Sequence, residues 1–104
     1  MVADDTRNML FYAALQKAIT PNRSIVLDVG AGTMLLSMMS VELGAKKVVG
    51  VEAHPTMCKI AKEVLRANNY TKEMKAGQIR LYEGEFQNLK LGHKYVCFAF
   101  YCPV

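Results

Sequence analysis

The sequence predicts an α/β fold, a Rossmann-like three-layer αβα sandwich around a mostly parallel sheet, and three observations lead to this prediction. Two apolar runs of strand length are separated by a helical pattern, a glycine-rich turn joins the first run to that helix, and an amphipathic helix follows the second run. Strands that alternate with helices pair in parallel through right-handed crossovers. We expect one domain over residues 1–104, truncated after about four strands and incomplete at its C-terminal end.

The chain opens with a helix and a buried strand. Apolar side chains at helical spacing indicate a helix over residues 6–19, with Asp5 or Thr6 as its N-cap and a Thr-Pro-Asn stop after it. Residues 24–29 (SIVLDV) are apolar on both faces of an extended chain. This pattern is typical of a central strand in a parallel sheet.

A second helix and a second strand follow the glycine turn. The pattern predicts a helix over residues 34–43 that stops at Gly44, then a strand over residues 47–51 (KVVGV). The side chains expected to face inward from this helix are Leu35, Leu36, Met39 and Leu43.

The second half repeats the alternation of helix and strand. Pro55 is suited to the first position of a helix that ends at Asn68-Asn69. Its apolar stripe consists of Met57, Ile60, Ala61, Val64 and Leu65. Residues 71–78 are polar and are interpreted as a loop, while 79–82 (IRLY) and 95–101 (YVCFAFY) are predicted to be the third and fourth strands.

Composition narrows the class of protein. The 104 residues carry a net charge of +4, but the basic residues are scattered along the sequence without interleaved aromatics, so we expect no direct nucleic-acid binding. The three cysteines form no C-x-x-C pair and no zinc-ligand spacing, so we expect a reduced protein without a metal site. No apolar run has the length of a membrane span, and the first residues lack a signal-peptide pattern. A cytoplasmic or nuclear location follows as an expectation.

The turn between the first strand and its helix is the main candidate binding feature. Gly30 and Gly32 permit positive φ angles and let a ligand approach the backbone. Glu52 ends the second strand, 22 positions after Gly30, close to the spacing expected of an acid that binds ribose hydroxyls. Together these residues predict a pocket for an adenosyl cofactor, with S-adenosylmethionine the preferred candidate.

A dinucleotide is the alternative ligand for such a turn. The G-x-G-x-x-G fingerprint requires glycine or alanine at position 35, where this chain has Leu35. Met34 and Leu35 would also crowd the helix N-terminus that a pyrophosphate needs. An NAD- or FAD-dependent oxidoreductase is therefore disfavoured.

Residues 1–90 resemble the cofactor-binding half of the protein arginine N-methyltransferases, class I S-adenosylmethionine-dependent enzymes. The stretches that match in order and spacing are Asp4-x-x-Arg7-Asn8 with Tyr12, residues 26–33 (VLDVGAGT), 35–39 (LLSMM), 44–48 (GAKKV) and 51–53 (VEA). The Arg-Asn pair and the LLSMM stretch are most similar to the branch of the family that forms monomethylarginine.

The resemblance assigns roles to seven residues. It implies that Arg7 binds the carboxylate of the cofactor's methionine moiety, and that Asp28 organises the methionine end through the turn backbone or a water. Gly30 and Gly32 would let the backbone approach the cofactor, and Glu52 would bind the ribose. Phe86 and Gln87 fall where the family packs and hydrogen-bonds adenine, although many relatives have an acid at the position of Gln87.

The sequence also departs from the family pattern. Met34 stands where the family has a third glycine, and its side chain must overpack the helix, point towards the cofactor or turn into the core. The family's two catalytic glutamates follow strand four, and no residue here corresponds to them. Glu83 and Glu85 flank the third strand and are only weak candidates for catalysis.

Two functional hypotheses follow from the resemblance. The first is the cofactor-binding portion of a protein arginine methyltransferase, inactive by itself, with an arginine-containing protein as substrate. The alternative is a catalytically inactive methyltransferase-like chain that regulates or scaffolds an active partner. In either case the expected outer edge of strand four is apolar and invites self-association or pairing with a partner chain.

Overall fold

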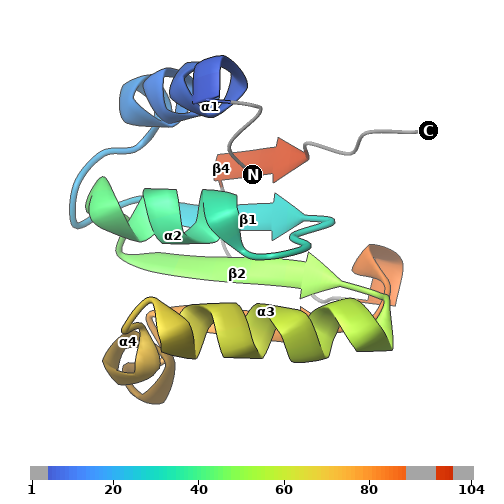
Figure 1. Cartoon of the computed structure of the whole chain (residues 1–104). Helices are drawn as coiled ribbons and strands as arrows, with labels where there is room; N and C mark the ends of the chain where they lie inside the picture. Colours follow the sequence, from blue (N-terminus) through green and yellow to red (C-terminus); the bar gives the residue numbers. More distant parts are fainter. Residues whose placement is uncertain (1–4, 89–95, 100–104) are drawn as a thin grey trace.

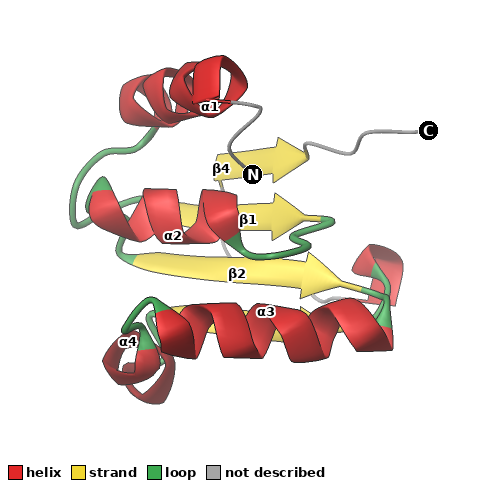
Figure 2. Ribbon diagram, in the orientation of Figure 1, coloured by secondary structure: helices red, strands yellow, loops and turns green. Residues whose placement is uncertain are grey.

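The structure is a computed structural model and describes residues 5–88 and 96–99, in which strands and helices alternate (Figures 1 and 2). The strands are β1 (Ile25–Val29), β2 (Lys47–Glu52), β3 (Ile79–Glu83) and β4 (Val96–Ala99). The helices are α1 (Asp5–Ala18), α2 (Leu35–Glu42), α3 (Pro55–Ala67) and α4 (Thr71–Ala76), with a short 3-10 helix η2 (Phe86–Asn88). None of the helices in this part of the chain is both long and apolar enough to cross a membrane.

The four strands form one parallel sheet in the order β3-β2-β1-β4. The central strand β1 pairs Asp28 with Gly50 of β2 and with Phe98 of β4. This arrangement confirms the predicted α/β fold and places β4 beside β1. Residues 95, 100 and 101 of the predicted fourth strand lie outside the described part of the chain.

The core lies on both faces of the sheet. Helices α2 and α3 lie in front of the strands in Figure 1, and the side chains buried on this face form two clusters. One cluster consists of Leu15, Ile19, Val26, Ala45 and Val48. The other consists of Met34, Ala61, Leu65, Tyr70 and Ile79, and a separate cluster of Leu27, Val49 and Val51 marks the opposite face. Because β1 and β2 are buried on both faces, their sequences lack the polar alternation of a half-exposed strand.

Helix α2 differs from the prediction in which side chains it buries. Leu35, expected to face inward, is its first residue and is 38% exposed. Leu36 and Met39 do pack against the core, but the fully buried positions are Ser37 and Ser40. Each serine is tolerated in the core because its hydroxyl donates a hydrogen bond, from Ser37 to the carboxylate of Asp28 and from Ser40 to the carbonyl of Leu36.

The polar stretch after α3 is a helix and not the predicted loop. Helix α4 covers Thr71–Ala76 and ends at Gly77, whose φ of 80° is the left-handed conformation of a helix C-cap. Tyr70 precedes this helix, and its hydroxyl donates a hydrogen bond to Glu42 Oε1 at 2.8 Å. This bond joins the start of α4 to the end of α2, so tertiary contacts stabilise a helix of only 6 residues.

The position of β4 at the end of the strand order leads to a testable expectation. Within the described residues no strand pairs with its outer side, and a free edge can pair with another chain. We expect the 104-residue chain to associate reversibly at high concentration. Sedimentation equilibrium should show a mass that rises with concentration, and a monodisperse monomer at several hundred micromolar would contradict this expectation.

Candidate functional site

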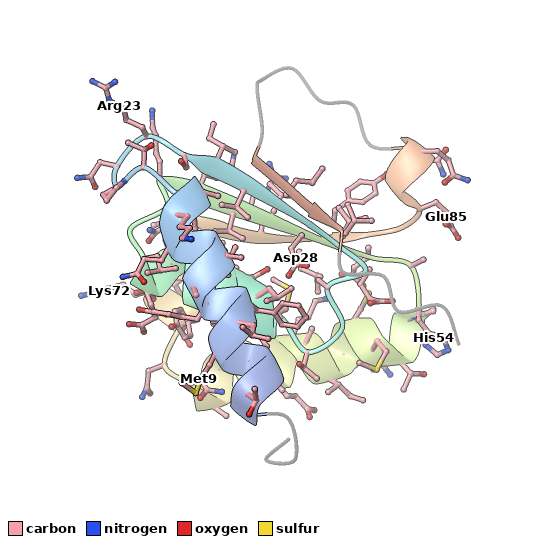
Figure 3. All side chains as sticks on the ribbon, turned by 90° about the horizontal axis from the view of Figure 1, so that it is seen from above. Met9, Arg23, Asp28, His54, Lys72 and Glu85 are labelled. Atoms are coloured by element: carbon pink, nitrogen blue, oxygen red, sulfur yellow. The ribbon has the colours of Figure 1, made fainter. Side chains whose placement is uncertain are left out.

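A cavity of about 240 Å³ opens at the carboxyl edge of the sheet, beyond the ends of β1, β2 and β3. Its lining residues are Val29, Gly30, Val51, Glu52, Ala53, Gly84 and Glu85. In Figure 3, His54 and Glu85 mark this end of the molecule, opposite Arg23 and Lys72. Because the chain runs from β1 to β2 on one side and reaches β4 on the other, the end of β1 is a topological switch point. Open parallel sheets bind ligands at such points.

The glycine turn forms one wall of the cavity and is fixed to the neighbouring strand. Gly30 and Gly32 have φ angles of 72° and 57°, which most side chains disfavour. A Cβ at Gly30 would meet no atom within 4 Å, so the backbone there faces open space. The N–H groups of Gly30 and Ala31 both donate to the Val51 carbonyl, at 2.9 and 3.0 Å. The turn is therefore held in position while its exposed side stays free for a ligand.

Glu52 points towards this turn from the end of β2. Its Oε1 accepts the N–H of Gly32 at 2.9 Å, and its Oε2 accepts the N–H of His54 at 3.0 Å. A carboxylate has about four acceptor positions, so about two remain available after these bonds. The carboxylate is thus oriented by the backbone on both sides and can accept two hydroxyl groups from the cavity.

Asp28 lies beneath the turn rather than in the cavity (Figure 3). The residue is 1% exposed, and its Oδ2 accepts the Ser37 hydroxyl at 2.9 Å. Burial raises the pKa of Asp28 to about 6, against the lowering effect of hydrogen bonds from the Ser37 side chain and backbone. The carboxylate therefore connects β1 to the first turns of α2, and its predicted role at the methionine end of the cofactor remains a prediction.

Met34 does not enter the cavity. Its backbone is left-handed, with φ of 69°, but its side chain is fully buried between the sheet and α3. A left-handed conformation costs a residue other than glycine about 1–2 kcal/mol. Burial of a methionine side chain contributes about 1.5–3 kcal/mol, which offsets this cost. Of the three orientations considered for Met34, the structure has the one that leaves the cavity open.

The structure brings together Gly30, Gly32 and Glu52, and three other predicted residues are not shown to join this group. Arg7 lies on α1, and its side chain is outside the described part of the structure, as is that of Phe86. Gln87 is exposed on η2 and does not line the cavity. The predicted contacts of these residues with the cofactor remain predictions.

Glu85 is the cavity residue that the sequence assigned only to a weak catalytic role. It follows Gly84, whose N–H donates to the Glu52 carbonyl at 3.0 Å and so places the end of β3 beside the end of β2. Glu83 points elsewhere, because it forms an ion pair with Lys62 at 2.7 Å. The signal that could have found Glu85 is its place two positions after the end of β3, at the edge where the other site residues lie.

The described side chains contain no group of three histidine, cysteine or acidic residues that could hold a metal ion. The polar groups of the cavity are two carboxylates and backbone amides. Such a set can accept hydroxyl or amino hydrogens from a ligand and donate to it through the backbone. This chemistry matches a nucleoside more closely than a phosphate, because the carboxylates of Glu52 and Glu85 would repel a phosphate.

Comparison with known proteins gives consistent results. Residues 6–91 match the model of the ribosomal protein L11 methyltransferase (PrmA) family. The chain is 42% identical over 77 residues to protein arginine N-methyltransferase 9 of Homo sapiens, covering 74% of this chain and 9% of that protein. It is 36% identical over 97 residues to protein arginine N-methyltransferase 7 of Drosophila ananassae, covering 88% of this chain and 13% of that protein.

Solved structures agree with the sequence comparisons. The PRMT1 enzyme-prozyme heterotetrameric complex with AdoHcy from Trypanosoma brucei contains a chain that matches with a TM-score of 0.76 and 27% identity. The match covers 95% of this chain and 30% of that one. The chain therefore spans about a tenth of the length of the two curated relatives described above, and under a third of the solved chain.

Proposed function

Because the chain belongs to the protein arginine methyltransferase family, as a segment of the methyltransferase fold, we propose that its cavity binds the adenosyl part of S-adenosylmethionine. The observation that carries this proposal is the orientation of Glu52, whose carboxylate is fixed beside the glycine turn with acceptor positions left over. A ribose offers two adjacent hydroxyl donors, which suit such a carboxylate.

The size and lining of the cavity fit part of this cofactor. Pockets for drug-sized ligands have volumes of about 300–1,000 Å³, so a cavity of about 240 Å³ suits a nucleoside and not the whole cofactor. The methionine end would extend along the turn towards α1, the helix that contains Arg7, and we propose that Arg7 binds its carboxylate. Glu85 lies at the β3 end of the cavity, away from the glycine turn, and its carboxylate would accept a hydrogen bond from the amino group of adenine. In this arrangement Phe86 and Gln87 would approach the base from η2.

When bound, S-adenosylmethionine would supply an activated methyl group, and the residues described here would position it. Glu52, held in place by the N–H groups of Gly32 and His54, would fix the ribose and so limit the orientations of the sulfonium. Asp28 would act indirectly, by fixing α2 below the turn. We assign no catalytic residue, because none of the described acids matches the catalytic glutamates implied by the resemblance.

The activity of the whole protein is also a proposal. We propose transfer of a methyl group to arginine in a protein substrate, in line with the names of the relatives. The alternative is an inactive chain that regulates a partner, and the enzyme-prozyme complex among the solved structures is an assembly with a second kind of chain. Two sequence features favour this alternative, Met34 and the missing catalytic glutamates. The buried side chain of Met34 leaves the cavity open, so the first of them loses weight.

Calorimetric titration tests the cofactor. We expect S-adenosylhomocysteine to bind the 104-residue chain with a dissociation constant in the micromolar range, about 8 kcal/mol of binding free energy. NAD should not bind measurably, because the helix after the turn begins with bulky residues. Tight binding of NAD, or failure of S-adenosylhomocysteine to bind at millimolar concentration, would overturn the proposal.

A further inference from the structure

The last residue of the glycine turn combines two features that rarely occur together. Met34 has a left-handed backbone, which glycine adopts freely, and it precedes α2 without a side-chain cap. Its side chain is nevertheless completely buried. The chain therefore keeps methionine at a position where the backbone alone would favour glycine.

The side chain of Met34 occupies a socket that Gly50 creates in the middle of β2. A Cβ on Gly50 would lie 2.5 Å from the Met34 sulfur and 2.8 Å from its terminal methyl carbon, far inside normal contact distances. The same Cβ would lie 3.1 Å from the methyl carbon of Ala31 in the turn. The absence of a side chain at Gly50 thus makes room for both residues.

This contact connects the turn to the rigid part of the fold. Met34 belongs to the core cluster that contains Ala61 and Leu65 of α3, and Ala31 of the turn packs against this cluster. Its N–H donates to the Ala31 carbonyl at 2.9 Å, which closes the turn behind the glycines. The other hydrogen bonds that hold the turn run from Gly30 and Ala31 to the Val51 carbonyl and from Gly32 to Glu52.

We propose that Met34 is a positioning residue: seated in the Gly50 socket, it holds the glycine turn in the shape that leaves the cavity open. The role in cofactor binding rests on the proposed function, whereas the effect on the turn does not. A glycine at position 34 would relieve the backbone strain but release the turn. Replacement of Met34 by glycine should therefore weaken the site rather than improve it.

The experiment compares three variants with the unmodified chain. Met34→Gly removes the side chain, and Met34→Leu is the matched control because leucine is similar in volume and apolar. Gly50→Ala fills the socket from the opposite side and leaves the methionine in the sequence. It tests the same contact if Met34→Gly does not fold.

Amide hydrogen exchange measured by NMR on the ligand-free chain is the first readout. In Met34→Gly and in Gly50→Ala, the amides of residues 30–32 should exchange about tenfold faster relative to the core amides of Leu27 and Val49. Met34→Leu should leave this ratio within about twofold of the original. A residue that only filled the core would change all of these amides together through global stability.

The affinity for S-adenosylhomocysteine is the second readout. Met34→Gly should bind about tenfold more weakly, and Met34→Leu should restore most of the affinity. Equal or tighter binding by Met34→Gly, or exchange in its turn that rises only in step with the core, would overturn the inference. If the unmodified chain does not bind while Met34→Gly still accelerates exchange in the turn alone, the proposed function fails and the positioning role stands.

Discussion

Replacement of Glu52 by alanine is expected to lower the affinity for S-adenosylhomocysteine by about a hundredfold. Hydrogen bonds to a charged group contribute about 1.5–3 kcal/mol each, and the proposed ribose contact contains two of them. A loss of about 3 kcal/mol corresponds to slightly more than a factor of 100 in the dissociation constant. Calorimetric titration of the variant measures the loss directly.

The neighbouring strand offers a matched control for this variant. Glu83 also ends a strand at the same edge, but it pairs with Lys62 outside the cavity. Glu83→Gln should therefore keep the original affinity within about twofold, since exposed ion pairs contribute little. Glu52 also holds the N–H of Gly32, so urea unfolding should confirm that Glu52→Ala is folded. If the Glu52→Ala variant is folded and its affinity is unchanged, Glu52 does not bind the ligand.

The second large effect is on the pH dependence of stability, through Asp28. Burial raises the pKa of this carboxyl from 3.8 to about 6 in the folded chain. The folded chain therefore holds the proton more tightly than the unfolded chain between these two values. The stabilisation is fully present below about pH 4 and is lost as the pH rises through 6, by about 3 kcal/mol in total.

Asp28→Asn isolates this contribution because an amide does not titrate. The difference in unfolding free energy, unmodified chain minus variant, should fall by about 3 kcal/mol between pH 3 and pH 7. Ser37→Ala removes the hydroxyl that lowers the pKa of Asp28. The unfolding free energy of this variant should therefore continue to fall to a higher pH than that of the unmodified chain. Urea titrations at a series of pH values give these curves. If the difference in unfolding free energy stays flat or rises with pH, the pKa of the buried Asp28 carboxyl is not raised.

The sequence contained enough information to predict the sheet and the proximity of Glu52 to the glycine turn. Strands buried on both faces have continuous apolar sequences, which is why β1 and β2 were predictable within one residue of their bounds. The glycine turn and Glu52 were also predictable, because their roles depend on residue type and spacing along two adjacent strands. The structure places Glu52 beside Gly32, as this spacing predicts.

Other features were missed because they depend on tertiary contacts, which local sequence patterns do not show. Helix α4 was missed because its polar residues suggested a loop, although helix-forming side chains before Gly77 were a usable signal. Leu35 was placed inward because it is apolar and lies four positions before Met39, but as the first residue of α2 it is 38% exposed. The burial of Met34 itself depends on the missing side chain at Gly50, a cross-strand relation that helical or strand periodicity does not reveal.

Mapping of amide chemical shifts with S-adenosylhomocysteine tests most directly the claim that the carboxyl edge of the sheet is an adenosyl site. We expect the largest changes on titration at Gly30, Gly32, Ala53 and Gly84, which surround the cavity or form its turn. The amides at the opposite end of the sheet, such as that of Lys46, should not move. Chemical-shift changes in α1 but not in the glycine turn, or no change at saturating ligand, would contradict an adenosyl site at this edge of the sheet.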